Sequence, residues 1–397
     1  MRFSLAGQLA HELRSLLRGY PDFVYSGEPP ARQGHVPVFV YHTIRPSRFE
    51  EDLRYLQEND YRTIGMRALR KHLTGERQVP KRSVVLTFDD ARSSFWRFGY
   101  PLLRRFEMKG VLFVIAGLTP AASSVRQNLF SVWEGEQTAN EIRAIDPDDT
   151  TLCTWPELRE MYNSGYVEIE SHSLFHKEVF VDTEIVDFLD PDSSFVPYNT
   201  SATAYLSLED AGQSIVPDEL YGLPVFQSAP LHEGRRAWIL SDDLIRFAKD
   251  QWTDLASEEI ESGGWKRSLR SWWARRNYVS ELRRQSPSEM RSGIVQDIAR
   301  SRALIREHVD SGAGNHFCLP YTVGSEVSLR SMEKLGVESC SWGALSEERH
   351  NTPGTTPMKI SRTKSDFLWR LPGEGQNSLL RVYGKKIGRR LRGDRVF

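Results

Sequence analysis

Short apolar runs alternate along this chain with segments whose apolar residues recur at helical spacing. Residues 38–41, 84–88 and 111–115 each have the length and composition of a buried strand, and helix-type patterns follow the first two. This alternation predicts a parallel sheet covered by helices, because parallel strands need a crossover connection that is usually a helix. An open doubly wound sheet and a barrel both satisfy the pattern.

The same alternation continues towards the C-terminus after one long interruption. We expect further strands at 167–169, 316–319 and 337–341, and helices at 96–106, 155–161 and 327–335. Ser47 and Glu50 have the spacing of a capping box and predict the start of a helix after the first strand.

The interruption at 179–290 is interpreted as an insertion into the sheet domain. It contains several prolines and a Trp-rich segment with Trp252, Trp265, Trp272 and Trp273. Flat aromatic faces suit sugar rings, but the near-helical spacing of these residues favours a buried stripe. The chain thus divides into an N-terminal extension (1–34), a main domain (35–370) with this insertion, and a basic tail (371–397).

Charge and cysteine content exclude several classes of protein. Lys plus Arg (52) nearly balance Asp plus Glu (53), so no net field attracts nucleic acid. The three cysteines are too few and too widely spaced for a disulfide framework. No segment approaches the roughly 18 apolar residues of a membrane span. The N-terminus shows no signal-peptide h-region, so a cytoplasmic location is expected. Oligomeric state is not predicted.

Metal-competent side chains follow two of the predicted strands. Asp89 and Asp90 follow the strand 84–88, and His172 and His176 follow the strand 167–169. Ligands bind at the carboxyl edge of parallel α/β folds, where two imidazoles and a carboxylate can hold a divalent ion. Taken separately, the aspartates could instead cap a helix and the histidines could sit in a hydrogen-bonded loop.

These segments resemble the first two motifs of the polysaccharide deacetylases with the NodB homology domain, carbohydrate esterase family 4. The motifs stand here as T-F-D-D-A and H-S-L-F-H. Residues 41–44 (Y-H-T-I), 155–158 (W-P-E-L) and 165–172 are also similar to the family pattern, as is F-C-L-P-Y at 317–321. The similarity covers about 36–178 and 291–365, and these motifs occur in the family order.

The resemblance implies a distorted (β/α) barrel with a divalent metal ion, zinc being the expected one, at the strand ends. Asp90, His172 and His176 match the metal ligands, and Asp89 matches the catalytic base. The backbone N–H of Tyr321 matches the donor that stabilises the oxyanion, and Pro320 is placed beside the substrate.

The sequence departs from the family pattern at two places. Cys318 occupies the position where many members carry an arginine that tunes the base, and the C-terminal L-x-H motif is absent. His350 is the nearest candidate for the missing general acid, with a solvated loop histidine as the alternative. Arg362, after an N-x-P-G-like segment, is a candidate substrate-binding residue. His42 is another, because it ends the first strand, although a hydrogen-bonded core histidine fits equally well.

These features predict a hydrolase that removes N-acetyl groups from an N-acetylated carbohydrate, with Asp89 accepting a proton from metal-activated water. The alternatives are a catalytically inactive carbohydrate-binding protein of the same fold and an amidohydrolase for a non-sugar amide. The basic tail offers a weak means of peripheral contact with an anionic membrane, against the alternative of a solvated terminus.

Overall fold

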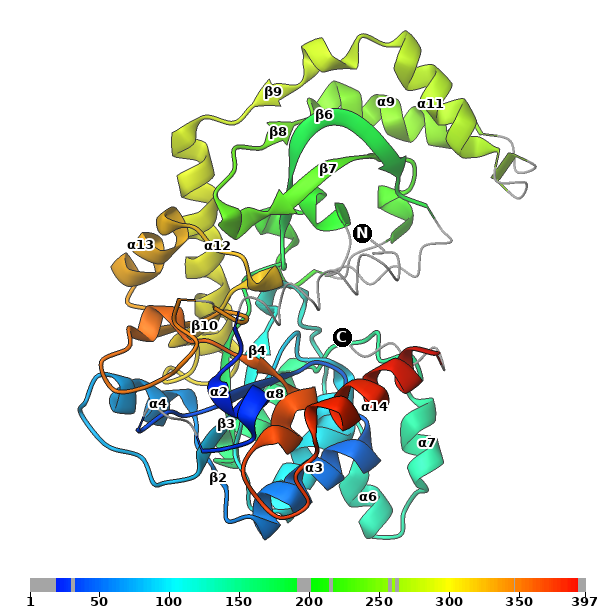
Figure 1. Cartoon of the computed structure of the whole chain (residues 1–397). Coiled ribbons are helices and arrows are strands. Elements are labelled where there is room, and N and C mark those ends of the chain that lie inside the picture. The colour runs from blue at the N-terminus through cyan, green and yellow to red at the C-terminus, as the bar shows by residue number, and fades with distance from the viewer. Residues whose placement is uncertain are drawn as a thin grey trace. The chain divides into compact units, whose positions relative to one another are not determined.

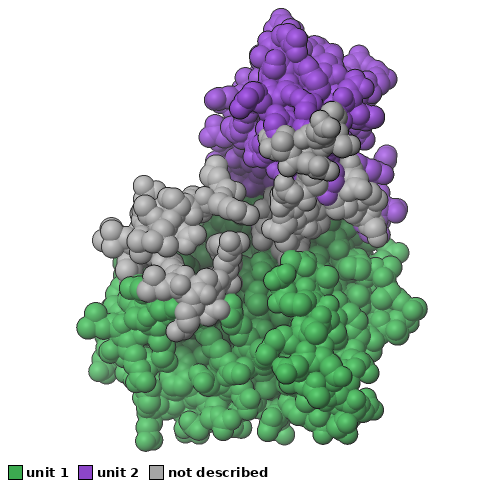
Figure 2. All heavy atoms as spheres, turned by 90° about the vertical axis from the view of Figure 1, so that its right-hand side faces the viewer, with its two compact units in different colours: residues 1–173, 301–322, 336–397 green, residues 174–300, 323–335 purple. Residues whose placement is uncertain are grey.

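The computed structural model describes residues 19–29, 33–190, 201–213, 217–255, 259–260, 264–345 and 347–391. The chain forms two compact units, coloured separately in Figure 2. Unit 1 contains residues 1–173, 301–322 and 336–397, and unit 2 contains residues 174–300 and 323–335. The second unit therefore includes the predicted insertion, begins five residues before it and ends later.

Unit 1 is built on a parallel eight-stranded sheet (Figure 1). Its strands are β1 (Val38–Tyr41), β2 (Arg62–Thr63), β3 (Ser83–Phe88), β4 (Gly110–Val114), β5 (Val167–Ser171), β10 (His316–Cys318), β11 (Ser339–Ser341) and β12 (Thr363–Lys364). The strand order is β11-β10-β5-β4-β3-β1-β12, and β2 pairs with β3. Beyond β11, Ser341 forms an isolated parallel bridge with Ile360, so the sheet continues to curve past its edge strand. The predicted distorted barrel is confirmed.

The helices of the sheet domain connect or cover these strands. They are α2 (Asp22–Ser26), α3 (Pro46–Glu58), α4 (Met66–Leu73), α5 (Tyr100–Arg105), α6 (Leu129–Trp133), α7 (Ala139–Ala144), α8 (Trp155–Asn163) and α14 (Leu379–Leu391). The long helix α12 (Pro287–His308) begins in unit 2 and ends in unit 1. Among the helices of the described ranges, none combines the length and apolar character needed to cross a membrane.

One face of the sheet packs against α4. Val85, Val111 and Phe113 from neighbouring strands form a buried cluster with Met66 and Leu69 of that helix. The helix start is held by Glu168 of β5, whose carboxylate accepts the Met66 N–H at 2.7 Å. This hydrogen bond satisfies one of the orphan donors of the first helical turn. The result is a rigid interior layer below the strand ends.

The predicted capping box was wrong. α3 begins at Pro46 without a side-chain cap, so Ser47 lies inside the helix and forms no capping box. Proline at the first helical position has a suitable fixed φ and no N–H that needs a partner, so it starts the helix here. The segment predicted as a helix at 96–106 is helical from Phe95 to Arg105, but its first part (Phe95–Gly99) is a π-helix that continues into α5, which has Pro101 near its start.

Both predicted terminal segments include ordered parts of unit 1. Phe23 of α2 is fully buried, and the Val24 carbonyl oxygen accepts a 2.8 Å hydrogen bond from Arg370. At the other end, Lys386 and Arg389 of α14 form ion pairs with the largely buried Asp366. The tail is therefore helical to Leu391 rather than a wholly solvated terminus, because its cations neutralise a buried carboxylate.

Unit 2 has its own hydrophobic core. It contains the antiparallel pair β6 (Glu178–Phe188) and β7 (Pro224–Pro230), the pair β8 (Trp238–Ile239) and β9 (Arg283–Arg284), and the helices α9 (Asp242–Thr253), α11 (Trp265–Arg275) and α13 (Glu326–Lys334). Trp265 and Trp273 are almost fully buried, and Trp252 and Trp272 pack against the same cluster. The buried-stripe interpretation of the tryptophans is confirmed.

Candidate active site

The two metal-competent motifs emerge from the carboxyl ends of β3 and β5. Four of their non-glycine residues have left-handed backbone conformations: Asp90 (φ 70°), Ala91 (φ 59°), Ser173 (φ 72°) and His176 (φ 56°). Such conformations cost free energy and persist only where surrounding contacts impose them, typically at functional sites. Both motifs therefore belong to tightly constrained loops.

Asp90, His172 and His176 are brought together as predicted. Each is buried, and each offers a ligand atom within 4.8 Å of the other two. The His172 Nε2 atom lies 3.6 Å from an Asp90 oxygen. Two imidazoles and one carboxylate at this spacing fit a divalent transition ion that keeps further positions open.

Neighbouring groups orient the candidate ligands. The His172 Nδ1 atom lies 3.0 Å from the Cys318 carbonyl oxygen, an arrangement that favours a proton on Nδ1 and leaves Nε2 available for the ion. Arg92 donates from Nε and one terminal nitrogen to the same Asp90 oxygen, at 3.1 and 3.0 Å. The other Asp90 oxygen faces His172, so the carboxylate can bind an ion and Arg92 together.

Asp89 also has ligand-like spacing to His172 and Cys318, but its carboxylate is bound by Arg362. The guanidinium donates two hydrogen bonds to the Asp89 carboxylate, at 2.6 and 2.8 Å, and both side chains are almost completely buried. Burial alone would raise the pKa of Asp89, but the charge of Arg362 and its hydrogen bonds outweigh burial and hold that pKa below its usual range. Asp89 is consequently ionised at neutral pH.

His42 and Cys318 lie beside the same carboxylate. The His42 Nε2 atom is 3.9 Å from an Asp89 oxygen, and the His42 side chain is 29% exposed. Burial lowers the pKa of His42, although both aspartates act in the opposite direction. The Cys318 sulfur lies 3.8 Å from Asp89, and burial raises the pKa of its thiol. Cys318 is therefore a neutral neighbour of the base.

Pro320 and Tyr321 follow β10 directly. Tyr321 has φ 55° and Thr322 has φ 58°, which makes this the third strand-end segment with left-handed non-glycine residues. The preceding Leu319 N–H is held by the Ser341 carbonyl oxygen of β11 at 3.1 Å. Because Cys318 contacts both His172 and Asp89, the turn that carries Tyr321 starts at the candidate site.

His350 is not brought to this edge. Its Nε2 atom lies 3.2 Å from Asp22, and its ring stands edge-on to His35, with 5.3 Å between the ring centroids. His35 precedes the start of β1, whereas Asp89 follows the end of the paired strand β3. His350 therefore lies near the opposite end of these strands, which argues against its predicted role as general acid.

Arg92 is the residue that sequence reasoning missed. Besides binding Asp90, its guanidinium donates to the Thr43 hydroxyl at 3.1 Å and so connects the first motif to the loop after β1. The signal in the sequence that could have identified Arg92 was its position two residues after Asp90. Another group, Glu168, Glu170 and His316, also has ligand-like spacing. Two of its carboxylate oxygens already accept backbone N–H groups, from Met66 and from His316.

The fold and the site define a parallel α/β barrel with an Asp/His centre at its strand ends. Residues 76–202 match the model of the polysaccharide deacetylase family. The fold is similar to the deacetylase domain of BpsB from Bordetella bronchiseptica, with a TM-score of 0.51 and 18% identity over 85% of this chain and 98% of that one.

Two curated relatives carry the name poly-beta-1,6-N-acetyl-D-glucosamine N-deacetylase. The Escherichia coli K12 protein is 29% identical over 133 residues, which is 33% of this chain and 18% of that protein. The Staphylococcus aureus MSSA476 protein is 24% identical over 132 residues, which is 33% of this chain and 37% of that protein. The matched region thus spans well under half of either relative.

Proposed function

We propose that this protein is a hydrolase that removes N-acetyl groups from an N-acetylated carbohydrate by cleaving the amide C–N bond. The proposal rests on one observation: the adjacent carboxylates Asp89 and Asp90 have different partners, which suits them to different roles. Asp90 belongs to the candidate ligand group with both histidines, whereas both carboxylate oxygens of Asp89 accept from Arg362, which lowers the pKa of Asp89. A binding protein has no need for an ionised base beside a ligand group.

The residues present fit a divalent metal ion. An ion held by Asp90, His172 and His176 would supply Lewis-acid chemistry for an amide carbonyl and for water. Asp89 is the proton acceptor, since it is ionised and its carboxylate is oriented by two hydrogen bonds. The Tyr321 backbone N–H is the proposed donor to the oxyanion. His42 is partly exposed beside Asp89 and is the proposed contact with the sugar or its leaving amine.

Acetate release tests this function. The purified chain should release acetate from oligomers of N-acetylglucosamine, a chelator should stop the reaction, and a divalent metal should restore it. The panel should include N-acetylated monosaccharides and a non-sugar acetamide. Release from the acetamide alone would favour the amidohydrolase alternative, whereas carbohydrate binding without any release would favour the inactive binding protein.

Metal content gives a prediction independent of turnover. The wild-type chain should retain about one divalent ion, and His172→Ala should lose it, because two ligands seldom hold a transition ion tightly. Elemental analysis of dialysed protein measures the ion, with zinc as the proposed identity. His308→Ala is the matched control, since His308 stacks on Trp155. Equal metal content in wild type and His172→Ala would contradict this ligand set.

We also propose weak contact of α14 with anionic membranes. Leu380 and Ile387 are 85% and 51% exposed and stand seven residues apart, two turns along one helix face, with Arg381 and Lys385 also exposed. The chain should sediment with vesicles containing phosphatidylserine at low salt. Replacing both apolar residues with serine should reduce that fraction. Equal sedimentation with neutral vesicles would contradict the electrostatic part of the proposal.

A further inference from the structure

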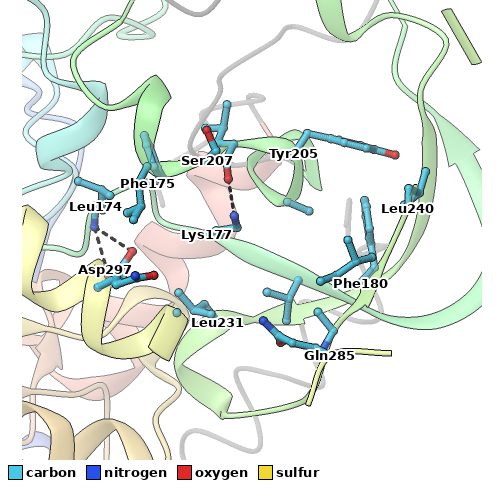
Figure 3. Close-up of a pocket in the computed structure, with 18 of the residues that line it drawn as sticks. Leu174, Phe175, Lys177, Phe180, Tyr205, Ser207, Leu231, Leu240, Gln285 and Asp297 are labelled. Atoms are coloured by element: carbon cyan, nitrogen blue, oxygen red, sulfur yellow. Dashed lines mark hydrogen bonds between the residues drawn. The ribbon is translucent and has the colours of Figure 1, made fainter. Parts of the chain in front are cut away.

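Unit 2 contains a pocket of about 370 Å³, formed entirely by residues 174–297 (Figure 3). This volume falls within the range of roughly 300–1,000 Å³ that is usual for small-molecule sites. The lining is mainly aliphatic and aromatic, with Phe175, Phe180, Leu231, Trp238 and Leu240 among its side chains. A ligand that fills this space must be largely apolar, since a bare sugar would leave most hydroxyl groups without partners.

One cation stands among these apolar walls. Lys177 lines the pocket and points towards the Leu206–Ser207 segment (Figure 3). Within the described ranges, its ammonium group makes one hydrogen bond, to the Leu206 carbonyl oxygen. An ammonium group has three N–H donors, so two remain for a ligand. Leaving them unpaired in apolar surroundings is costly, and an anionic group would offset that cost.

Asp297, the carboxylate that lines the pocket, already has other hydrogen-bonding partners. Asp297 accepts the Leu174 N–H at 3.2 and 3.3 Å and lies 3.2 Å from the His232 Nε2 atom. Burial lowers the pKa of Lys177, whereas the charges of Asp297 and Asp210 act in the opposite direction. Neither carboxylate forms an ion pair with Lys177 in the part of the chain that the structure describes, so an anionic ligand is the partner that would stabilise its charge. Lys177 is thus the group best placed to recognise an anion.

We infer that unit 2 binds a single-chain anionic amphipath, with its hydrocarbon chain along the apolar walls and its carboxylate or phosphate on Lys177. Binding at this site does not depend on the proposed deacetylase chemistry. Leu174, Phe175 and Lys177 nevertheless surround His176 in the sequence, so the second motif and the pocket share one segment.

Calorimetry on the full chain tests this inference with dodecanoate, dodecyl phosphate and dodecanol, the two anions below their micellar concentrations and the alcohol below its solubility limit. Both anions should bind once per chain and the neutral alcohol should bind more weakly. Lys177→Met should weaken anion binding by about tenfold or more, the usual effect of losing a charge-assisted hydrogen bond. Lys249→Met, at an exposed lysine of α9, is the matched control and should leave binding unchanged.

A second measurement keeps the inference falsifiable if Lys177→Met fails to fold. Dodecanoate brominated along its chain should quench tryptophan fluorescence, and Trp238→Phe should remove most of that quenching, because Trp238 lines the pocket. Tighter binding of dodecyl phosphate would point to a phosphate-linked lipid, and tighter binding of dodecanoate to a free fatty acid. Equal affinity for dodecanol, or quenching unchanged in Trp238→Phe, would overturn the assignment.

Discussion

Asp89→Asn is expected to lower kcat/KM by about 10²–10⁴-fold, the usual contribution of a general base, while the metal content stays at the wild-type level. The amide keeps the shape of the carboxylate but cannot accept a proton from water. It leaves Arg362 without its counter-charge, so some loss of thermal stability is also expected. Circular dichroism and elemental analysis establish that the variant is folded and loaded before its turnover is measured.

Asp90→Asn is the matched comparison, because it makes the same chemical change one residue further along. It should lower the metal content first and lose activity in proportion to that loss, since Asp90 belongs to the candidate ligand group. Excess metal should restore part of the activity of Asp90→Asn and none of that of Asp89→Asn. Near-normal kcat/KM in fully loaded Asp89→Asn would remove this residue from the proposed mechanism.

Arg362→Met is expected to move the acid limb of kcat/KM to higher pH and to destabilise the protein by about 3–5 kcal/mol at neutral pH, because it leaves a carboxylate buried and unpaired. In the wild type, burial raises the pKa of Asp89 and Arg362 more than offsets this rise. Without Arg362 the effect of burial remains, so the pKa of Asp89 is higher. The carboxyl group is then protonated at a higher pH, and the fraction of enzyme with an ionised base falls earlier as the pH is lowered.

The stability effect has a defined direction with pH. Because the pKa of Asp89 is lowered in the folded protein, its ionisation stabilises the fold above the unfolded-state pKa of about 3.9, and this contribution is lost as pH falls through the folded-state pKa. The difference in unfolding free energy between wild type and Arg362→Met should therefore be largest near neutral pH and shrink in acid. Denaturant titrations at several pH values measure it.

Two controls isolate the Arg362–Asp89 pair. Arg362→Lys keeps the positive charge and should retain more stability and a smaller shift of the acid limb than Arg362→Met. The double variant Arg362→Met/Asp89→Asn should be more stable than the sum of the single effects predicts, because neither buried charge remains. Metal content must be checked at each pH. If the acid limb of kcat/KM is unchanged in metal-loaded Arg362→Met, Arg362 does not set the ionisation of the base.

Local sequence pattern was sufficient for the core of the sheet domain. The apolar runs that became β1, β3 and β4 lie within one or two residues of their predicted bounds, since buried parallel strands need continuous apolar residues. The two motifs follow such runs immediately, so Asp90, His172 and His176 could be expected at one edge. They meet there because parallel strands share a carboxyl edge.

Pairings between distant segments could not be predicted in this way. Arg362 stands 273 positions from Asp89 and reaches it through β12, a two-residue strand without apolar alternation that pairs with β1. The same long-range pairing places His350 near the start of β1, away from the site proposed for it. The charge partner of a buried carboxylate depends on which strands lie side by side, and short strands leave no periodic signal.

The sequence by itself determined the alternating strands and helices and the identity of the candidate ligands, because these depend on local periodicity and on the chemistry of a few side chains. Tertiary structure alone decided that Arg362 binds Asp89, that Arg92 binds Asp90, and that Lys177 stands in an apolar pocket. Those outcomes depend on burial and on close approach in three dimensions. Together they decide whether a charged side chain in surroundings of low polarity has a charged partner.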